Sequence, residues 1–152
     1  MTRLLIVHHT PSPATQELLE AAVGGASDDA IEGVEVVVRP ALVCSEVEAL
    51  EADGYVLGTP ANIGYMSGAL KHFFDRAYYP CLTATQRRPY GLYVHGNQDM
   101  TGAVRSVTSI AGALEWREVA APVTVDGQPD AADTEAVYEL AGTVAAVLVE
   151  GL

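Results

Sequence analysis

The sequence contains few cysteines and no long apolar run. Its two cysteines, Cys44 and Cys81, lie far apart, without a CxxC motif or a cluster of histidine and cysteine. This usage argues against a disulfide framework and a zinc site, and it is typical of a reducing compartment. No apolar run reaches the length of about 18 residues that a membrane helix needs, and residues 1–13 do not resemble a signal peptide. We therefore expect a cytoplasmic protein without membrane insertion.

Basic residues are scarce as well. The chain has 8 Lys plus Arg against 20 Asp plus Glu, which gives a formal net charge of -12. Nucleic-acid binding needs a basic surface that neutralises phosphates, so we expect no nucleic-acid partner. The acidic residues either keep the protein soluble or form a docking surface for a basic redox partner. With 152 residues, 49% of them hydrophobic and 18% charged, the chain is expected to form a single domain over residues 1–152.

Strand and helix patterns alternate along the chain. Apolar, β-favouring runs predict five strands, at residues 4–7, 34–38, 54–58, 90–94 and 119–125. Apolar residues at helical spacing predict helices from Thr15 to Gly24-Gly25, at 46–52, 67–79 and 103–114, and from about Asp130 onward. Five strands that alternate with helices indicate a parallel sheet with helices on both faces.

The second and fifth strands have the weakest apolar patterns. A glutamate interrupts 34–38, and 119–125 contains Pro122, which an edge strand tolerates and a central strand does not. Placing both at the edges gives the strand order 2-1-3-4-5 in a three-layer α/β/α sandwich. In such a sheet the ligand lies beyond the carboxyl ends of the strands, near the point where the strand order reverses. The loops after the first, third and fourth strands meet there.

The loop after the first strand is rich in hydroxyl groups. In "HHTPSPAT", residues 8–15, Thr10, Ser12 and Thr15 lie where a helix begins. A helix N-terminus stabilises a phosphate through free N–H groups and a partial positive charge. Simple capping by Ser12, with Pro13 at the first helical position, explains part of the pattern without a ligand. Capping needs only one hydroxyl, however, so the loop also fits an anion site.

The loop after the third strand is apolar, whereas such connections are usually polar. Ile63, Tyr65 and Met66 either cover the core or form a wall against a planar heteroaromatic ring. Gly64 permits close approach or a positive φ. The loop after the fourth strand, "HGNQDMTG" at residues 95–102, is polar. It can close the other side of such a ring, although a lone histidine such as His95 is more often a simple surface residue.

The run "GTPANIGYMSGALKHFFDR", residues 58–76, resembles the flavodoxin-like FMN-binding family. It is most similar to the NAD(P)H-dependent FMN reductases and to the tryptophan-repressor-binding-protein type of NAD(P)H:quinone oxidoreductase. These proteins share a "GTP…G.MSG..K.F.D" pattern. The matching positions are Gly58, Thr59, Pro60, Gly64, Met66, Ser67, Gly68, Lys71, Phe73 and Asp75.

The resemblance implies a flavodoxin-like fold and one bound FMN. It assigns the FMN phosphate to Thr10, Ser12, Ala14 and Thr15 of the first loop, with His9 and Pro13 as further cofactor-binding residues of the same loop. It assigns the flavin ring to the other two loops, at Pro60, Ala61, Asn62, Ile63, Gly64, Tyr65, Met66, His95, Gly96 and Asn97. We expect no catalytic side chain, since a flavin supplies the chemistry itself.

The same resemblance implies an NAD(P)H-dependent oxidoreductase that reduces a quinone or a similar small acceptor. The first loop departs from the family pattern, because it carries Pro11 and Pro13 and no glycine. The third of these loops, residues 95–102, is shorter than the corresponding loop of the quinone oxidoreductases. We therefore expect a second subunit to complete a nicotinamide pocket, in a homodimer or larger assembly. Two alternatives stay open: a flavodoxin-type electron carrier that serves a redox protein partner, and a cofactor-free binding module.

Overall fold

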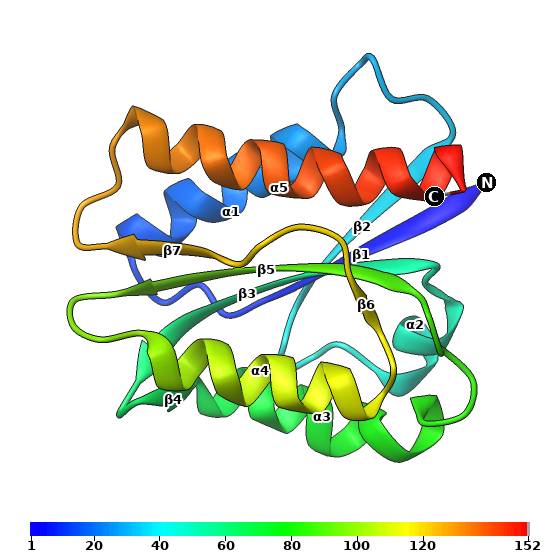
Figure 1. The fold of residues 1–152 in the computed structure, drawn as a ribbon, viewed down its shortest axis with the longest axis horizontal. Coiled ribbons are helices and arrows are strands. Elements are labelled where there is room, and N and C mark those ends of the chain that lie inside the picture. Colours follow the sequence, from blue (N-terminus) through cyan, green and yellow to red (C-terminus); the bar gives the residue numbers. More distant parts are fainter. Residues whose placement is uncertain (152) are drawn as a thin grey trace.

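The computed structural model describes residues 1–151, which form a twisted sheet between two layers of helices (Figure 1). The strands are β1 (Thr2–His8), β2 (Val34–Pro40), β3 (Gly54–Asn62), β4 (Tyr65–Met66), β5 (Pro89–Gly96), β6 (Arg117–Glu118) and β7 (Val123–Asp126). The order along the sheet is β2-β1-β3-β5-β6, with β7 also paired to β5. All of these pairs are parallel. The predicted order 2-1-3-4-5 is thereby confirmed, with β5 as its fourth strand.

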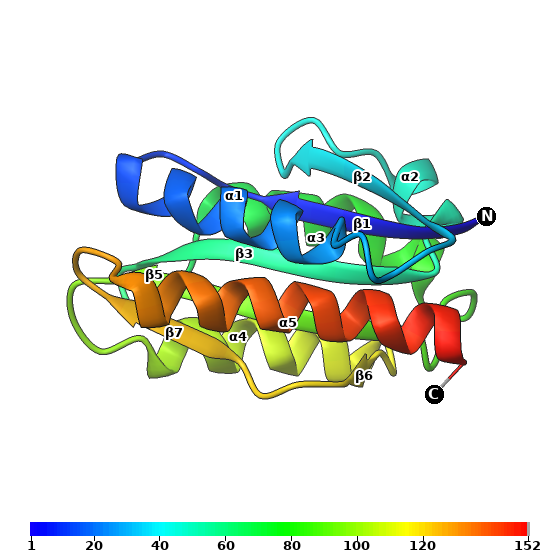
Figure 2. The same cartoon turned by 90° about the horizontal axis from the view of Figure 1, so that it is seen from above.

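Two helices cover one face of the sheet, and three cover the other (Figures 1 and 2). On the first face lie α1 (Pro13–Ala26) and α5 (Ala131–Glu150). On the second lie α2 (Glu46–Glu51), α3 (Gly68–Cys81) and α4 (Thr101–Ala113). Each face has its own apolar core, because the central strands carry buried side chains on both sides. No helix within residues 1–151 is both long enough and apolar enough to cross a bilayer.

Helix α1 does not end at Gly24-Gly25, as the sequence predicted, but continues to Ala26. The reason is the packing of α1 against α5. A Cβ atom added to Gly25 would lie 1.9 Å from the carbonyl oxygen of Tyr138. The two glycines therefore act as a close helix–helix contact rather than as a stop signal.

The predicted strand 119–125 is also wrong in its extent. The chain pairs at Arg117–Glu118, leaves the ladder over residues 119–122, and pairs again at Val123–Asp126. Pro122 lies just before the second segment and has no N–H to donate to a neighbouring strand. The outer edge of the sheet is consequently split into β6 and β7.

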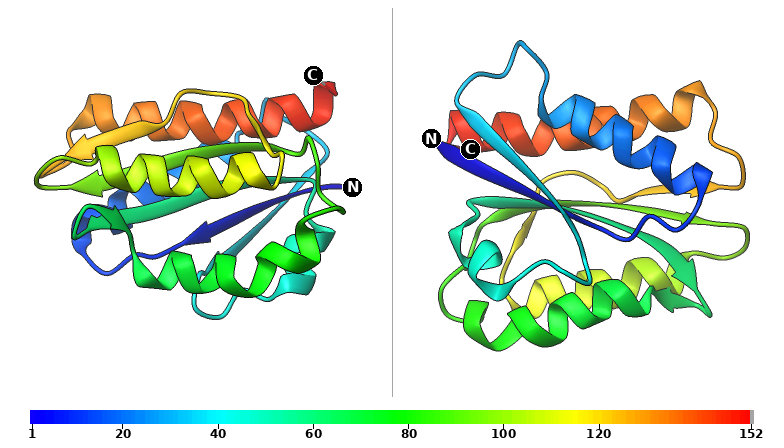
Figure 3. Two further views of the ribbon diagram at one scale, coloured as in Figure 1. Left: turned by 60° about the horizontal axis from the view of Figure 1, so that its bottom comes forward. Right: turned by 180° about the vertical axis from the view of Figure 1, so that it is seen from behind.

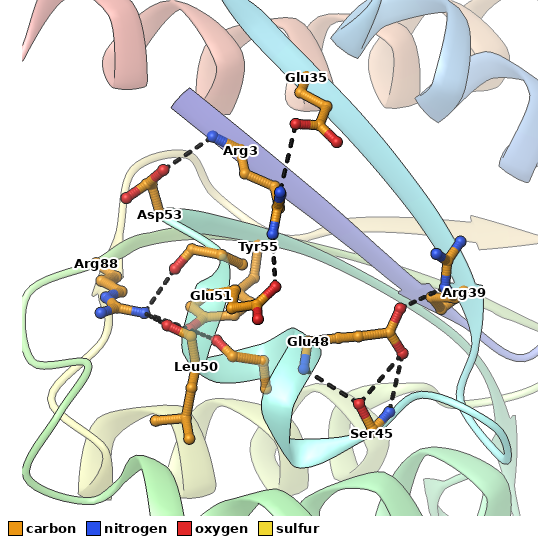
Figure 4. Close-up of polar contacts among 12 residues, drawn as sticks. Arg3, Glu35, Arg39, Ser45, Glu48, Leu50, Glu51, Asp53, Tyr55 and Arg88 are labelled. Atoms are coloured by element: carbon orange, nitrogen blue, oxygen red, sulfur yellow. Dashed lines mark hydrogen bonds and ion pairs between the residues drawn. The ribbon is translucent and has the colours of Figure 1, made fainter. Parts of the chain in front are cut away.

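The six-residue helix α2 is held by polar contacts at both ends (Figure 4). At its start, Ser45 and Glu48 form a capping box. At its end, Nη1 of Arg88 donates to the carbonyl oxygens of Leu50 and Ala52, at 2.7 and 2.6 Å. Such a short helix is marginal alone, so these contacts and its burial keep it folded.

The only tryptophan, Trp116, lies in the core between the sheet and α3. Its ring stacks on Tyr55, with centroids 3.9 Å apart and an interplanar angle of 10°. Its indole N–H donates to the hydroxyl of Thr85 at 2.8 Å. The one polar atom of this large side chain is thus satisfied inside the core.

A β-hairpin replaces the loop that was predicted after the third strand. Strand β3 turns back into β4, with Ala61 opposite Met66, at the end of the molecule where α4 begins (Figure 3). The buried Thr59 hydroxyl donates to the carbonyl oxygen of Pro60 at 2.8 Å and accepts from the N–H of Ser67 at 3.0 Å. The N–H of Met66 donates to Oγ of Ser106 on α4 at 3.1 Å. These bonds attach the hairpin to α3 and α4.

Thr59→Val tests this attachment. Valine has nearly the shape of threonine but leaves the buried N–H of Ser67 and the carbonyl of Pro60 without this partner. We expect the free energy of unfolding to fall by about 1–3 kcal/mol, measured by urea denaturation. Thr59→Ser retains the hydroxyl and is expected to lose less stability. Equal losses for the two variants would contradict a role for the hydroxyl.

Candidate functional site

The loops after β1, β3 and β5 lie together at the carboxyl end of the sheet. The loops after β1, β5 and β7 are seen at one end of Figure 2. The N–H of His9 donates to the carbonyl oxygen of Gly58 at 3.0 Å, which joins the first loop to β3. Pro60 on β3 is paired with His95 on β5, which brings the second and third loops side by side. The structure thus places all three predicted segments along one edge.

The hydroxyl groups of the first loop bond to one another. Oγ of Ser12 accepts from the N–H of Thr15 at 3.2 Å, and the N–H of Ser12 donates to Oγ1 of Thr15 at 3.1 Å. This is a capping box at the start of α1. The Thr10 hydroxyl lies 2.7 Å from Nδ1 of His8. Pro13 is exposed and Ala14 is partly buried in the first helical turn, where N–H groups have no preceding helical carbonyl.

Two histidines stand at the entrance to this loop. Burial lowers the pKa of His8, and repulsion from His9 lowers it further. His8 is therefore neutral at pH 7, since its ordinary pKa is already about 6.5. Nδ1 of His9 is buried and has no hydrogen-bond partner among the described residues. An unpartnered buried nitrogen is costly, and a ligand atom would satisfy it.

The turn of the hairpin holds an isoleucine in a left-handed conformation. Ile63 has φ 50 and Gly64 has φ 69, so both central residues have a positive φ, as in the two-residue hairpin turns that favour Asn-Gly. Ile63 is nevertheless fully exposed, with a relative exposure of 105%. A β-branched residue with a positive φ is strained, and such strain often marks functional positions. This residue is the most unusual feature of the edge.

The other apolar residues of the hairpin differ in burial. Tyr65 is 42% exposed, whereas Met66 is 2% exposed and belongs to the core. The turn is pressed against α4, because a Cβ atom on Gly102 would lie 2.0 Å from the carbonyl oxygen of Gly64. The apolar side chains of the hairpin that face solvent are therefore those of Ile63 and Tyr65.

The third loop is fixed to the end of β7. Nε2 of His95 lies 2.7 Å from the carbonyl oxygen of Gly127, and His95 is buried. The N–H of Gly127 donates to the carbonyl oxygen of Gly96 at 2.9 Å. Asn97 of the third loop and Asn62 of the hairpin are both exposed. Asn97 therefore lies at the surface, and one ring nitrogen of His95 holds the third loop against the end of β7.

Sequence reasoning missed the residues that support this edge. Ser106, Gly102 and Gly127 contact the hairpin or the third loop, but each lies far from its partner in the sequence. Neither Gly102 and Ser106, within α4, nor Gly127, in the turn after β7, has a local sequence pattern that reveals such a contact. Only Thr59 and Ser67 had a signal, as positions of the "GTP…G.MSG" motif.

The residues at this edge fit FMN in their chemistry. The hydroxyls of Thr10, Ser12 and Thr15 and the start of α1 suit a phosphate. The unpartnered Nδ1 of His9 adds a polar atom beside them. Ile63 supplies exposed apolar surface on the next loop, which suits the face of a flavin ring.

Known proteins of similar sequence and structure include several flavodoxins. A flavodoxin of Aquifex aeolicus (strain VF5) is 32% identical over 75 residues, which cover 49% of this chain and 40% of that protein. The chain therefore spans less than half of this relative. A flavodoxin, WrbA-like protein from Agrobacterium tumefaciens superimposes with a TM-score of 0.79 at 18% identity, over 99% of both chains. A flavodoxin from the domain Archaea gives a TM-score of 0.83 at 15% identity, over 97% of this chain and 99% of the other.

The solved structures establish the flavodoxin-like fold. The family assignment rests on the sequence, because the model of the family "NADPH-dependent FMN reductase" matches residues 46–130. That match covers more than half of the chain, from α2 to the start of α5, and includes the hairpin and the third loop. The chain therefore belongs to the NADPH-dependent FMN reductase family of flavodoxin-like, FMN-binding proteins.

Proposed function

We propose that the chain binds one FMN at the carboxyl edge of the sheet and acts as a flavodoxin-type electron carrier. The observation that carries the proposal is the hairpin turn, which keeps Ile63 exposed at the cost of a strained backbone. The similarity to flavodoxins in both sequence and structure supports it. A reducing compartment such as the cytoplasm suits a protein whose two cysteines are both free.

In this proposal the first loop holds the FMN phosphate, through Thr10, Ser12, Ala14 and Thr15. The Thr15 hydroxyl donates to the carbonyl oxygen of Ser12 at 3.0 Å. The Ser12 hydroxyl accepts the capping N–H and can still donate its own hydrogen to a phosphate oxygen. No lysine or arginine lies between residues 9 and 33. Hydroxyls, backbone N–H groups and the start of α1 would therefore balance the phosphate charge.

The hairpin and the third loop hold the ring, by residues 60–66 and 95–97. FMN, when bound, supplies the electron-transfer chemistry. Ile63 and Tyr65 exclude water from the ring face, and backbone N–H groups hydrogen-bond its polar edge. Since Nε2 of His95 is engaged with Gly127, His95 positions the third loop more than it contacts the ring.

A second candidate function is an NADPH-dependent oxidoreductase that reduces a quinone or a similar small acceptor. The family match over residues 46–130 favours it. Hydride transfer needs no acid or base from the protein, so the expectation that no side chain is catalytic fits both candidates. The oxidoreductase differs from the carrier in needing a site for a nicotinamide beside the ring.

Ile63→Asn separates strain from binding. Asparagine tolerates the left-handed region, so the FMN-free variant should be more stable than the wild type, by about 1 kcal/mol. FMN affinity should fall at least tenfold, because the apolar wall is lost. Flavin fluorescence quenching measures the affinity, and urea denaturation measures the stability.

Glu115→Asn, at another positive φ of 60, is the matched control and should leave FMN affinity unchanged. Unchanged affinity in Ile63→Asn would refute the proposed wall.

Replacing Ser12 and Thr15 together by alanine tests the phosphate site. Hydrogen bonds to charged groups contribute about 1.5–3 kcal/mol each, so FMN affinity should drop tenfold or more. Riboflavin lacks the phosphate and should bind wild type and variant about equally. Ser45→Ala removes the comparable capping box of α2 and should not change FMN affinity. If riboflavin weakens as much as FMN, the loss reflects damage to the helix start.

NADPH oxidation distinguishes the two candidate functions. The FMN-loaded protein is mixed with NADPH and a soluble quinone, and its mass in solution is measured alongside. The carrier predicts a monomer with negligible turnover that accepts electrons from a separate reductase. Steady turnover by a dimer or larger assembly would instead establish the oxidoreductase, with a second subunit completing the nicotinamide site.

A further inference from the structure

His8 is a buried ionisable residue that has no role in the proposed function so far. It is the last residue of β1, it is 8% exposed, and it pairs in register with Pro40 on β2 and with Gly58 on β3. Successive side chains of a strand alternate between the faces of a sheet, and Leu4 and Ile6 pack in the core under α1 and α5. The side chain of His8 therefore lies on the face that α1 covers, at the start of the first loop.

The ring of His8 forms one hydrogen bond within residues 1–151. Its Nδ1 lies 2.7 Å from Oγ1 of Thr10. Burial lowers the pKa of His8, so the ring is neutral at pH 7 and carries a single N–H. Nδ1 can then either accept the hydrogen of the Thr10 hydroxyl or donate its own to the hydroxyl oxygen. The position of one hydrogen on the ring decides between the two arrangements.

These arrangements have opposite effects on a phosphate beside Thr10. If Nδ1 accepts, Thr10 gives its only hydrogen to His8 and presents lone pairs to the anion, which repel the phosphate oxygens. If Nδ1–H donates, the hydroxyl keeps its own hydrogen for a phosphate oxygen. The hydrogen on the His8 ring therefore determines whether Thr10 stabilises or repels the phosphate.

The donor of Thr10 matters because the first loop has few others. The Thr15 hydroxyl already donates to the carbonyl oxygen of Ser12 at 3.0 Å. Thr10 and Ser12 are consequently the hydroxyls of this loop that can still donate to a ligand. Residues 9–33 contain no lysine or arginine. Loss of one hydroxyl donor would therefore remove a large share of the side-chain contribution of this loop.

We propose that His8 is a positioning residue of the phosphate site, which donates from Nδ1–H to Thr10 so that Thr10 donates to a phosphate oxygen of FMN. The inference rests on the proposed FMN site and names a residue that acts there without contacting the ligand. Since only the phosphate is affected, His8 contributes to the preference for FMN over riboflavin. Its effect is expected to pass entirely through Thr10.

Two amide substitutions test the inference by the affinities for FMN and riboflavin, measured by flavin fluorescence quenching. His8→Gln places its amide at the position of Nε2, and it should weaken FMN about tenfold or more and riboflavin less than about twofold. His8→Asn places an N–H donor at the position of Nδ1 and should restore most of the FMN affinity. His72→Gln removes an exposed histidine of α3 and should change neither affinity. Equal FMN losses in His8→Gln and His8→Asn would contradict a donor at Nδ1.

A double-mutant cycle with Thr10→Val separates positioning from packing. Thr10→Val removes the hydroxyl and should itself weaken FMN about tenfold or more. His8→Gln added to Thr10→Val should then have little further effect, because both changes act through the same hydrogen bond. Additive losses would show that His8 supports the loop only by packing, and they would overturn the inference.

Nitrogen NMR of the histidine-labelled, FMN-loaded protein at pH 7 locates the hydrogen directly. The inference requires a hydrogen on Nδ1 of His8, and a bare Nδ1 would refute it. FMN binding that is stronger than riboflavin binding, yet equal in wild type and His8→Gln, would refute the role of His8 and retain the phosphate site. Failure of the wild type to bind FMN would instead refute the proposed function and the inference together.

Discussion

The hydroxyl of Thr59 joins the candidate site to the rest of the fold. It lies at the point where β3 leaves the sheet, and it bonds both to the carbonyl of Pro60 and to the N–H that precedes α3. Moving the hairpin away would leave these buried groups without partners, which costs free energy. The strain at Ile63 persists because this base is fixed. The position of the proposed ring-binding surface thus depends on the polar contacts of Thr59 at the base of the hairpin.

The alternation of apolar runs was sufficient to predict the layers and the strand order, because buried parallel strands and amphipathic helices leave strong local patterns. Contacts between distant residues left none. Gly24 and Gly25 resemble a helix end in the sequence, yet Gly25 meets the backbone of Tyr138. The apolar character of Met66 fitted a ligand wall as well as a core, and only the structure places its side chain in the core. The hairpin was missed because Ile63 is an uncommon residue in its turn.

Capping and anion binding were posed as alternatives for the first loop, and the structure shows the capping. Ser12 and Thr15 already cap α1 through their oxygen atoms. A cap of this kind holds the hydroxyls in place before a ligand binds, and this reduces the entropic cost of binding. The two prolines around Ser12 restrict the loop further. In the proposed phosphate site, this rigidity would take the place of the glycine that the family pattern has at this loop.

Trp116 gives the protein an internal optical reporter. Its indole is stacked on Tyr55 and bonded to Thr85 within the core beneath the sheet. Since it is the only tryptophan, the intrinsic emission excited at long wavelength arises from this one place. A red shift of that emission would report water entering the core on the α3 side, while the α1–α5 side would remain invisible to it. Unfolding of the two layers can therefore be followed separately, by combining tryptophan emission with a probe placed on α1 or α5.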